Sequence, residues 1–359
     1  MAIFLLLTLM VTFVGMKPAK NGEFHSTYIS RSQSTAINGL FTLLVFFSHV
    51  STYISLNSAF DKPYSSFKSY LLQLVVAPFL FYSGYGIMES IKKKGTDYVK
   101  QIPKNRFLKV LLHFDIAVVL FLVLNAVTGK TFPLKKILLA FTGYSSVGNS
   151  NWYIFAVLGL YLIVFAAFII ARKNKVLGVI LVTLLSVGFV YLQMRLKRPS
   201  HCYDTIIIFA AGMIFSLVRE KAENLLTRHE AVYYTALGLC FLAYTFFYLK
   251  RKSGIEFYSM WGILFMALVV LFTMKVQIGN GILEFFGSHV FSIYILQRLP
   301  MIILTKTGLA TSHKYVFVSL CFFATVAMAV LFDLATDKLD GVLFRKRIKK
   351  AVAAEAEKN

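Results

Sequence analysis

The chain has 359 residues, of which 58% are hydrophobic and only 15% are charged. A soluble domain averages about 45–50% apolar and about 25% charged residues, so the composition excludes a soluble globular protein and predicts a multi-pass membrane protein. The net charge of +22 would suggest nucleic-acid binding in a soluble protein. Here the basic residues lie between apolar runs, where they set topology and contact anionic head groups, so the lipid bilayer is the expected partner and nucleic acid is not.

The first apolar segment covers residues 2–16. It is short for a membrane span, but it has no basic start and no convincing small-residue cleavage site. We therefore expect an additional spanning helix here, and a signal peptide is the alternative. Residues 1–30 are predicted to comprise this apolar segment and a basic linker.

Ten further apolar runs follow, each near the roughly 20 residues that a helix needs to cross the hydrocarbon. They start near Ala36, Tyr70, Phe107, Trp152, Val176, Tyr203, Ala231, Phe257, Ile282 and Tyr315. No polar, Pro-rich or Ser-rich stretch is long enough for a linker or a second domain. The sequence thus predicts an all-α polytopic helical bundle, with about ten spans and the N-terminal helix, in a single membrane domain at 31–337.

The distribution of lysine and arginine indicates the orientation of the chain. Basic residues resist translocation, so the lysine-rich loop at 89–106 and the basic tail at 338–359 are expected on the cytoplasmic side. The loops predicted on the opposite side also contain lysines and arginines. The excess of basic residues on the predicted cytoplasmic side is therefore moderate. It supports the predicted orientation less strongly than the composition supports the membrane prediction.

The first long span carries Asn38 and His49. Eleven residues at about 100° each return almost to the same face of a helix, about 16 Å further along its axis, so both side chains can line one groove. A neutral imidazole can accept a proton at physiological pH, which makes His49 a candidate general base. The alternative is a packing histidine that bonds a neighbouring hydroxyl or carbonyl group. The high cost of ionisable groups inside spans favours the functional reading.

The third span begins with Lys104, Arg106 and Lys109. Arg106 and Lys109 are three residues apart, so on a regular helix they face the same way and can hold a phosphate between two cations. The alternative is ordinary anchoring at the membrane surface. His113 and Asp115 are two residues apart and diverge by about 200°, so we do not expect them to pair.

Aromatic and acidic side chains gather at two further span ends. Tyr203 and Asp204 can meet a polar substrate, although N-capping of the following helix is the expected role of Asp204 taken alone. For Trp152 and Tyr153, the alternative to a role in a site is ordinary anchoring at the membrane interface. The small residues of FYSGYG, at residues 81–86, predict close approach of two helices.

Several common cofactor motifs are missing from the sequence. We find no GxGxxG, GxxxxGK[ST], HExxH or GxSxG pattern, and the three cysteines show no CxxC spacing. No bound cofactor and no metal are therefore expected. Matched inverted repeats, which many secondary transporters carry, are not visible either.

Six stretches, in order along the chain, resemble the membrane-bound acyltransferase-3 family, whose members O-acylate bacterial surface carbohydrates. They are AINGLFTLLVFFSH at 36–49, FYSGYGI at 81–87, KNRFLK at 104–109, SNWYI at 150–154, YDTIIIFAAGMIFS at 203–216 and GSHVFSIYILQRLP at 287–300. The resemblance implies a catalytic role for His49. The family usually has a basic residue eleven positions earlier, where this chain has Asn38, so the pair of catalytic candidates departs from the family pattern at Asn38. The family's paired basic motif falls on Arg106 and Lys109.

The resemblance also implies a reaction. Acyl-coenzyme A, with acetyl-coenzyme A first among the candidates, is the implied co-substrate, and Lys104, Arg106 and Lys109 would hold its phosphates. The implied acceptor is a hydroxyl of a cell-surface or lipid-linked carbohydrate, bound by Trp152, Tyr153, Tyr203 and Asp204. The implied location is the bacterial cytoplasmic (inner) membrane, with a polysaccharide-synthesis complex as a further partner.

Two alternatives remain at this point. A transporter or flippase could use the same buried histidine and basic cavity to move a lipid-linked sugar without chemistry. A catalytically degenerate family member, suggested by Asn38, could act as a scaffold.

Overall fold

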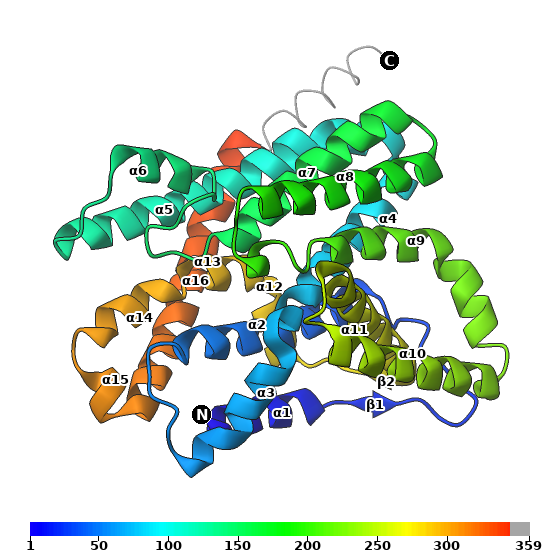
Figure 1. Cartoon of the computed structure of the whole chain (residues 1–359), viewed down its shortest axis with the longest axis horizontal. Coiled ribbons are helices and arrows are strands. Elements are labelled where there is room, and N and C mark those ends of the chain that lie inside the picture. The colour runs from blue at the N-terminus through cyan, green and yellow to red at the C-terminus, as the bar shows by residue number, and fades with distance from the viewer. Residues whose placement is uncertain (345–359) are drawn as a thin grey trace. The chain divides into compact units, whose positions relative to one another are not determined.

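The structure is a computed structural model that describes residues 1–344, and most of these residues are helical (Figure 1). Strands β1, Lys17–Pro18, and β2, Val276–Gln277, form an antiparallel pair in which Lys17 lies opposite Gln277. The predicted all-α architecture is thus confirmed. Most basic residues of the predicted tail lie outside the described residues: Arg345, Lys346, Arg347, Lys349, Lys350 and Lys358.

Sixteen α-helices follow one another along the described part of the chain. In the first half they are α1 (Ala2–Phe13), α2 (Arg31–Val50), α3 (Lys62–Leu71), α4 (Ala77–Ile102), α5 (Lys109–Val127), α6 (Leu134–Phe141), α7 (Trp152–Ala171) and α8 (Lys175–Arg195). In the second half they are α9 (Ile207–Leu226), α10 (Glu230–Lys250), α11 (Ile255–Lys275), α12 (Gly281–Ser288), α13 (Val290–Leu296), α14 (Arg298–Thr305), α15 (Leu309–Ser312) and α16 (Lys314–Leu343). Short 3-10 turns cover Ala59–Asp61, Leu72–Val76 and Ser200–Cys202, and a π-helical turn covers Pro103–Leu108.

The chain forms two compact units. Unit 1 comprises Met1–Lys100 and Gly159–Val290, and unit 2 comprises Gln101–Leu158 and the described residues from Phe291 onward. Both units contain parts of the domain predicted at 31–337, whose extent stays a prediction.

Seven helical segments in the described part of the chain are long and apolar enough to cross a membrane, or eight if the broken pair α12 and α13–α14 is one span. The protein is therefore a multi-pass membrane protein. All ten expected runs contain helices, but the count differs for two reasons. The segment Ala59–Val127 contains two of the expected spans. Helix α2 is not among the seven, because polar side chains such as Gln33, Asn38 and His49 lower its hydropathy.

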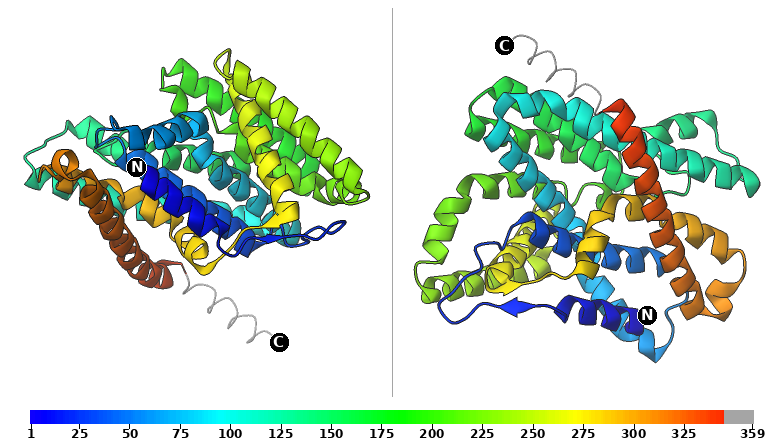
Figure 2. Two further views of the ribbon diagram at one scale, coloured as in Figure 1. Left: turned by 90° about the horizontal axis from the view of Figure 1, so that it is seen from below. Right: turned by 180° about the vertical axis from the view of Figure 1, so that it is seen from behind.

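The expectation that residues 2–16 span the membrane is not met. Helix α1 has 12 residues, which at 1.5 Å each give a length of about 18 Å, well below the roughly 30 Å of hydrocarbon. It packs instead against α2 and α12 in unit 1 (Figure 2). The Phe4 and Phe47 rings stack with centroids 5.3 Å apart, and the Asn280 amide donates to the carbonyl oxygens of Val11 and Val14.

The small residues at 81–86 do allow the predicted close helix approach. A Cβ atom built on Gly84 of α4 would lie 2.0 Å from the carbonyl oxygen of Phe209 in α9. The two backbones are therefore in direct contact within unit 1.

Candidate functional site

Helix α2, which carries His49, is fixed by backbone contact with α12. A Cβ atom on Gly39 would lie 1.8 Å from the Leu283 carbonyl oxygen, and one on Gly287 would lie 1.9 Å from the Thr35 carbonyl oxygen. Only glycine allows the two helices to approach so closely. At its start, α2 is capped by the Ser30 hydroxyl, which accepts a hydrogen bond of 3.2 Å from the backbone N–H of Gln33.

His49 lies in the last turn of α2 and is half-buried. The Lys68 ammonium of α3 donates to the Ser48 carbonyl oxygen at 3.2 Å and to the Ser51 hydroxyl at 2.7 Å. The Thr52 hydroxyl donates to the His49 carbonyl oxygen at 2.7 Å. A cation at a helix C-terminus complements the negative end of the helix dipole. Lys68 therefore holds the turn that carries the candidate base.

Asn38 lies eleven residues before His49 on the same helix, as the sequence predicts. It is partly buried, and among the described residues its side-chain Oδ1 has no hydrogen-bond partner. One and two turns earlier, Thr35 and Arg31 line a hollow of about 680 Å³, which Glu284 and Ser288 of the α12 side also line. A cation is thus present on the α2 side of this hollow, although none stands at position 38.

In unit 2, the candidate donor-binding residues lie on an irregular helix. Lys104 and Arg106 belong to the π-helical turn Pro103–Leu108, and Lys109 begins α5. The expected common face of Arg106 and Lys109 assumed regular α-helical spacing, which this turn does not have. Such turns occur often at functional sites. The Lys104 ammonium lies 5.6 Å from the centroid of the Phe344 ring.

Lys109 forms an ion pair with Asp340 of α16. The Lys109 side chain is 41% exposed and the Asp340 side chain 6%. The other Asp340 oxygen, Oδ1, lies 3.0 Å from Nε2 of His113, one turn after Lys109 on α5. A phosphate at Lys109 would therefore compete with a carboxylate that is already in place.

The expectation that His113 and Asp115 do not pair is confirmed, because His113 bonds Asp340 instead. The Oδ1 atom of Asp115 has no hydrogen-bond partner among the described residues. Asp340 is 227 positions from His113, and no local spacing points to it.

Trp152 and Tyr153 open α7 in unit 2 and join an aromatic cluster. Their ring centroids are 6.0 Å apart, and the Tyr153 ring meets the Tyr294 ring edge-on at 5.4 Å. In the same unit, Nε of Arg298 donates to the Ser150 hydroxyl at 3.1 Å. Partly buried rings beside a cation and a hydroxyl are compatible with a polar ligand that has apolar faces.

Tyr203 and Asp204 precede α9 in unit 1. The expectation that Asp204 caps this helix is wrong, because α9 begins at Ile207 and its cap residue, Ile206, offers no side-chain hydrogen bond. Asp204 is only 5% exposed, and its Oδ1 has no hydrogen-bond partner among the described residues. Its carbonyl oxygen accepts a hydrogen bond of 3.4 Å from the Ser259 hydroxyl.

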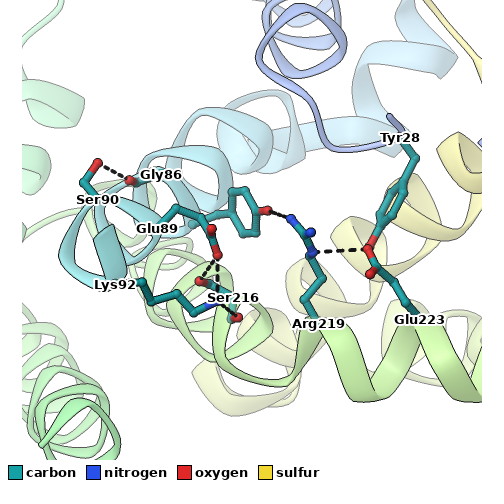
Figure 3. Close-up of polar contacts among 9 residues, drawn as sticks. Tyr28, Gly86, Glu89, Ser90, Lys92, Ser216, Arg219 and Glu223 are labelled. Carbon is teal, nitrogen blue, oxygen red and sulfur yellow. Dashed lines mark hydrogen bonds and ion pairs between the residues drawn. The ribbon is translucent and has the colours of Figure 1, made fainter. Parts of the chain in front are cut away.

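Figure 3 shows a polar network between α4 and α9 that no sequence motif indicated. The Glu89 carboxylate accepts from Lys92 at 2.8 Å and from the Ser216 hydroxyl at 2.6 Å. The Lys92 ammonium also donates to the Ser216 carbonyl oxygen at 2.5 Å. A short-range Glu and Lys three residues apart was the one available signal for part of this network.

The network continues along α9 to the segment that precedes α2 (Figure 3). Arg219 lies 3.1 Å from the Glu223 carboxylate and donates to the Tyr85 hydroxyl at 2.5 Å. The Tyr28 hydroxyl donates to Glu223 at 2.8 Å. Burial, reinforced by the hydrogen bond to Glu223, raises the pKa of Tyr28 well above its ordinary value. Each carboxylate here is matched by a cation, so the network ties the approach to α2 to α9.

A model of a protein family, described as an acyltransferase domain, matches residues 35–334 of the 359-residue chain. No match was found among curated proteins or among solved structures. The family match covers most of the chain, including all six stretches that resemble the family. The protein is thus a membrane enzyme that transfers acyl groups other than aminoacyl groups, and it belongs to the acyltransferase-3 family.

Proposed function

We propose that this enzyme moves an acyl group, acetyl in the simplest case, from acyl-coenzyme A to a hydroxyl of a cell-surface or lipid-linked carbohydrate in the bacterial cytoplasmic membrane. The observation that carries the proposal is the setting of His49, a histidine in the last turn of a helix whose end is held by Lys68. A general base must sit on a rigid element if it is to take a proton from a positioned hydroxyl.

In the proposed reaction, His49 takes the proton of the acceptor hydroxyl while the hydroxyl oxygen attacks the thioester carbonyl carbon. The carbon–sulfur bond then breaks, the acyl group stays on the acceptor oxygen, and the proton passes from His49 to the departing thiolate of coenzyme A. Atoms and charges balance without a redox step. Lys68 acts as a positioning residue, because it holds the Ser48 carbonyl next to His49 in the chain.

The phosphates of acyl-coenzyme A are proposed to bind at Lys104 and Arg106 in unit 2. Lys109 contributes less than its charge suggests, because Asp340 already pairs with it. Charge-assisted contacts to phosphate are strong but are screened by salt, so donor binding should weaken as ionic strength rises.

Two pairs of residues, each within one unit, are proposed for contact with the acceptor sugar: Trp152 and Tyr153 in unit 2, and Tyr203 and Asp204 in unit 1. Aromatic rings suit the CH faces of a sugar, and a carboxylate oxygen accepts its hydroxyls. The unpartnered Oδ1 of Asp204 supports this role, since a buried oxygen without a partner is costly.

The test uses inverted membrane vesicles that contain the enzyme, radiolabelled acetyl-coenzyme A and the glycan of the host. His49→Gln should reduce label transfer by about 100-fold to 10,000-fold, the usual contribution of a general base. The matched control is His229→Gln, which changes an exposed histidine in the same unit. Equal transfer by His49→Gln and the wild type would exclude His49 as the base. Absence of label from wild-type glycan would exclude acetyl-coenzyme A as the donor for that acceptor.

A further inference from the structure

A hollow of about 570 Å³ lies in unit 1 between the last turns of α4 and the end of α7. None of the residues proposed for catalysis or for donor or acceptor binding lines it. The lining residues are Thr96, Val99, Lys100, Phe168, Ile169, Arg172 and Lys173.

Two residues with positive φ, Gly95 and Arg172, lie in the segments that form this hollow, the second of them in its lining. Gly95 has φ +59° and ψ −141°, values that interrupt α4 and that a residue with a Cβ atom strongly disfavours. Thr96 and Lys100 follow this break. Arg172 has φ +53° directly after α7 ends at Ala171, which is uncommon for a residue other than glycine. Such strain often accompanies a functional constraint.

The charge in the hollow is uncompensated. Lys100, Arg172 and Lys173 are exposed, and none of them forms an ion pair with any residue in the described part of the chain. The lining includes no acidic side chain. Three cations around one hollow make a binding site for an anionic group, since their mutual repulsion falls when a negative charge enters.

The remaining wall is apolar and lies at the end of a membrane span. Val99 and Phe168 are buried, while Ile169 is 47% exposed. Helix α7 has 20 residues, or about 30 Å at 1.5 Å each, so its last turn lies near the level of the lipid head groups. A soluble phosphate would leave this apolar wall unused, whereas the acyl chains of a lipid would cover it.

We propose that this hollow binds the phosphate-bearing headgroup of an anionic phospholipid, with Lys100, Arg172 and Lys173 around the phosphate and the acyl chains beside Ile169. The same phosphate chemistry could be supplied by a soluble compound, so the test must separate the two sources. A basic residue near an anionic membrane surface contributes about a five-fold preference, so removing two should lower the preference about 25-fold.

The experiment measures binding of phosphatidylglycerol to the purified full-length protein in nanodiscs whose other lipid is phosphatidylcholine. The test variant is Arg172→Gln/Lys173→Gln, and the control is Lys221→Gln/Arg228→Gln, which removes two exposed cations from the same unit. We expect the preference for phosphatidylglycerol to fall about 25-fold in the test variant and to stay at the wild-type value in the control. An equal loss in both variants would show general surface electrostatics and overturn the proposal.

Two further arms sharpen the result. Gly95→Ala changes no charge, but a Cβ atom disfavours the positive φ of residue 95. The substitution should therefore shift the following turn of α4, which carries Lys100, and should also weaken phosphatidylglycerol binding. Its control is Gly86→Ala in the same helix, where a Cβ atom would meet nothing within 4 Å. Displacement of the lipid by coenzyme A or inorganic phosphate would assign the hollow to a soluble phosphate compound and overturn the lipid proposal. These measurements do not depend on acyl transfer, so they can fail while the His49 test succeeds.

Discussion

Replacing Gly39 by alanine should displace α2 and slow acyl transfer. The added Cβ would lie 1.8 Å from the Leu283 carbonyl oxygen, and ordinary contact begins at 3.4 Å, so the helices must separate by about 3.4 − 1.8 = 1.6 Å. Overpacking of this kind costs about 1–3 kcal/mol. A shift of about 1 Å in a positioned group can cost about 100-fold in rate, and α2 carries His49.

The assay compares label transfer from acetyl-coenzyme A and the thermal unfolding midpoint in detergent. The matched control is Gly281→Ala in α12, where a Cβ atom would meet nothing within 4 Å. We expect Gly39→Ala to lose about 100-fold in kcat and to melt at a lower temperature, while Gly281→Ala stays near the wild type in both. A Gly39→Ala enzyme with the wild-type rate and midpoint would refute the argument that backbone contact with α12 positions the base.

Three other outcomes follow from the contacts described. Asp340→Asn should cost about 1–3 kcal/mol and lower the unfolding midpoint; the cost is below that of a fully buried pair because Lys109 is 41% exposed. The control Asp337→Asn, at an exposed position, should leave the midpoint unchanged. Equal midpoints for the two variants would contradict a stabilising role of Asp340. Arg106→Gln should raise KM for acyl-coenzyme A more than it lowers kcat, and an unchanged KM in steady-state kinetics would remove Arg106 from donor binding. Because folding raises the pKa of Tyr28, the protonated Tyr28 hydroxyl contributes its full stabilisation of the folded state below about pH 10. This contribution is lost as the pH rises further. The unfolding midpoint of Tyr28→Phe should therefore be below that of the wild type at pH 7, and the gap should shrink towards about pH 11; a gap that grows with pH would reverse this sign.

Much of the fold could be predicted because apolar runs mark helices directly. All ten expected runs contain helices, and the close packing at 81–86 follows from small residues. The N-terminal helix is shorter than its apolar run predicts, because apolar composition does not say where a helix ends. Helix α1 ends at Phe13, one turn before the end of its apolar run.

The sites were predicted less completely, since their partners come from distant parts of the chain. The positions of Asn38 and His49 on one helix followed from their spacing, but Lys68 reaches the end of α2 only through the placement of α3. The pairing of Lys109 with Asp340 likewise depends on tertiary packing. The N-cap expected at Asp204 failed because α9 starts later than the apolar run does.

The wide turn at Pro103–Leu108 sets the register of the helix that follows it. A π-helical turn holds more residues per revolution than an α-helix, so winding Pro103–Leu108 as a regular α-helix with all of its residues kept would change this register. Everything downstream would then rotate by about 100° around the axis of α5. Lys109 and His113 would turn away from Asp340 together, although every charge would be retained. The wide winding of this turn is thus as strict a requirement for the pairing as the identity of the three side chains.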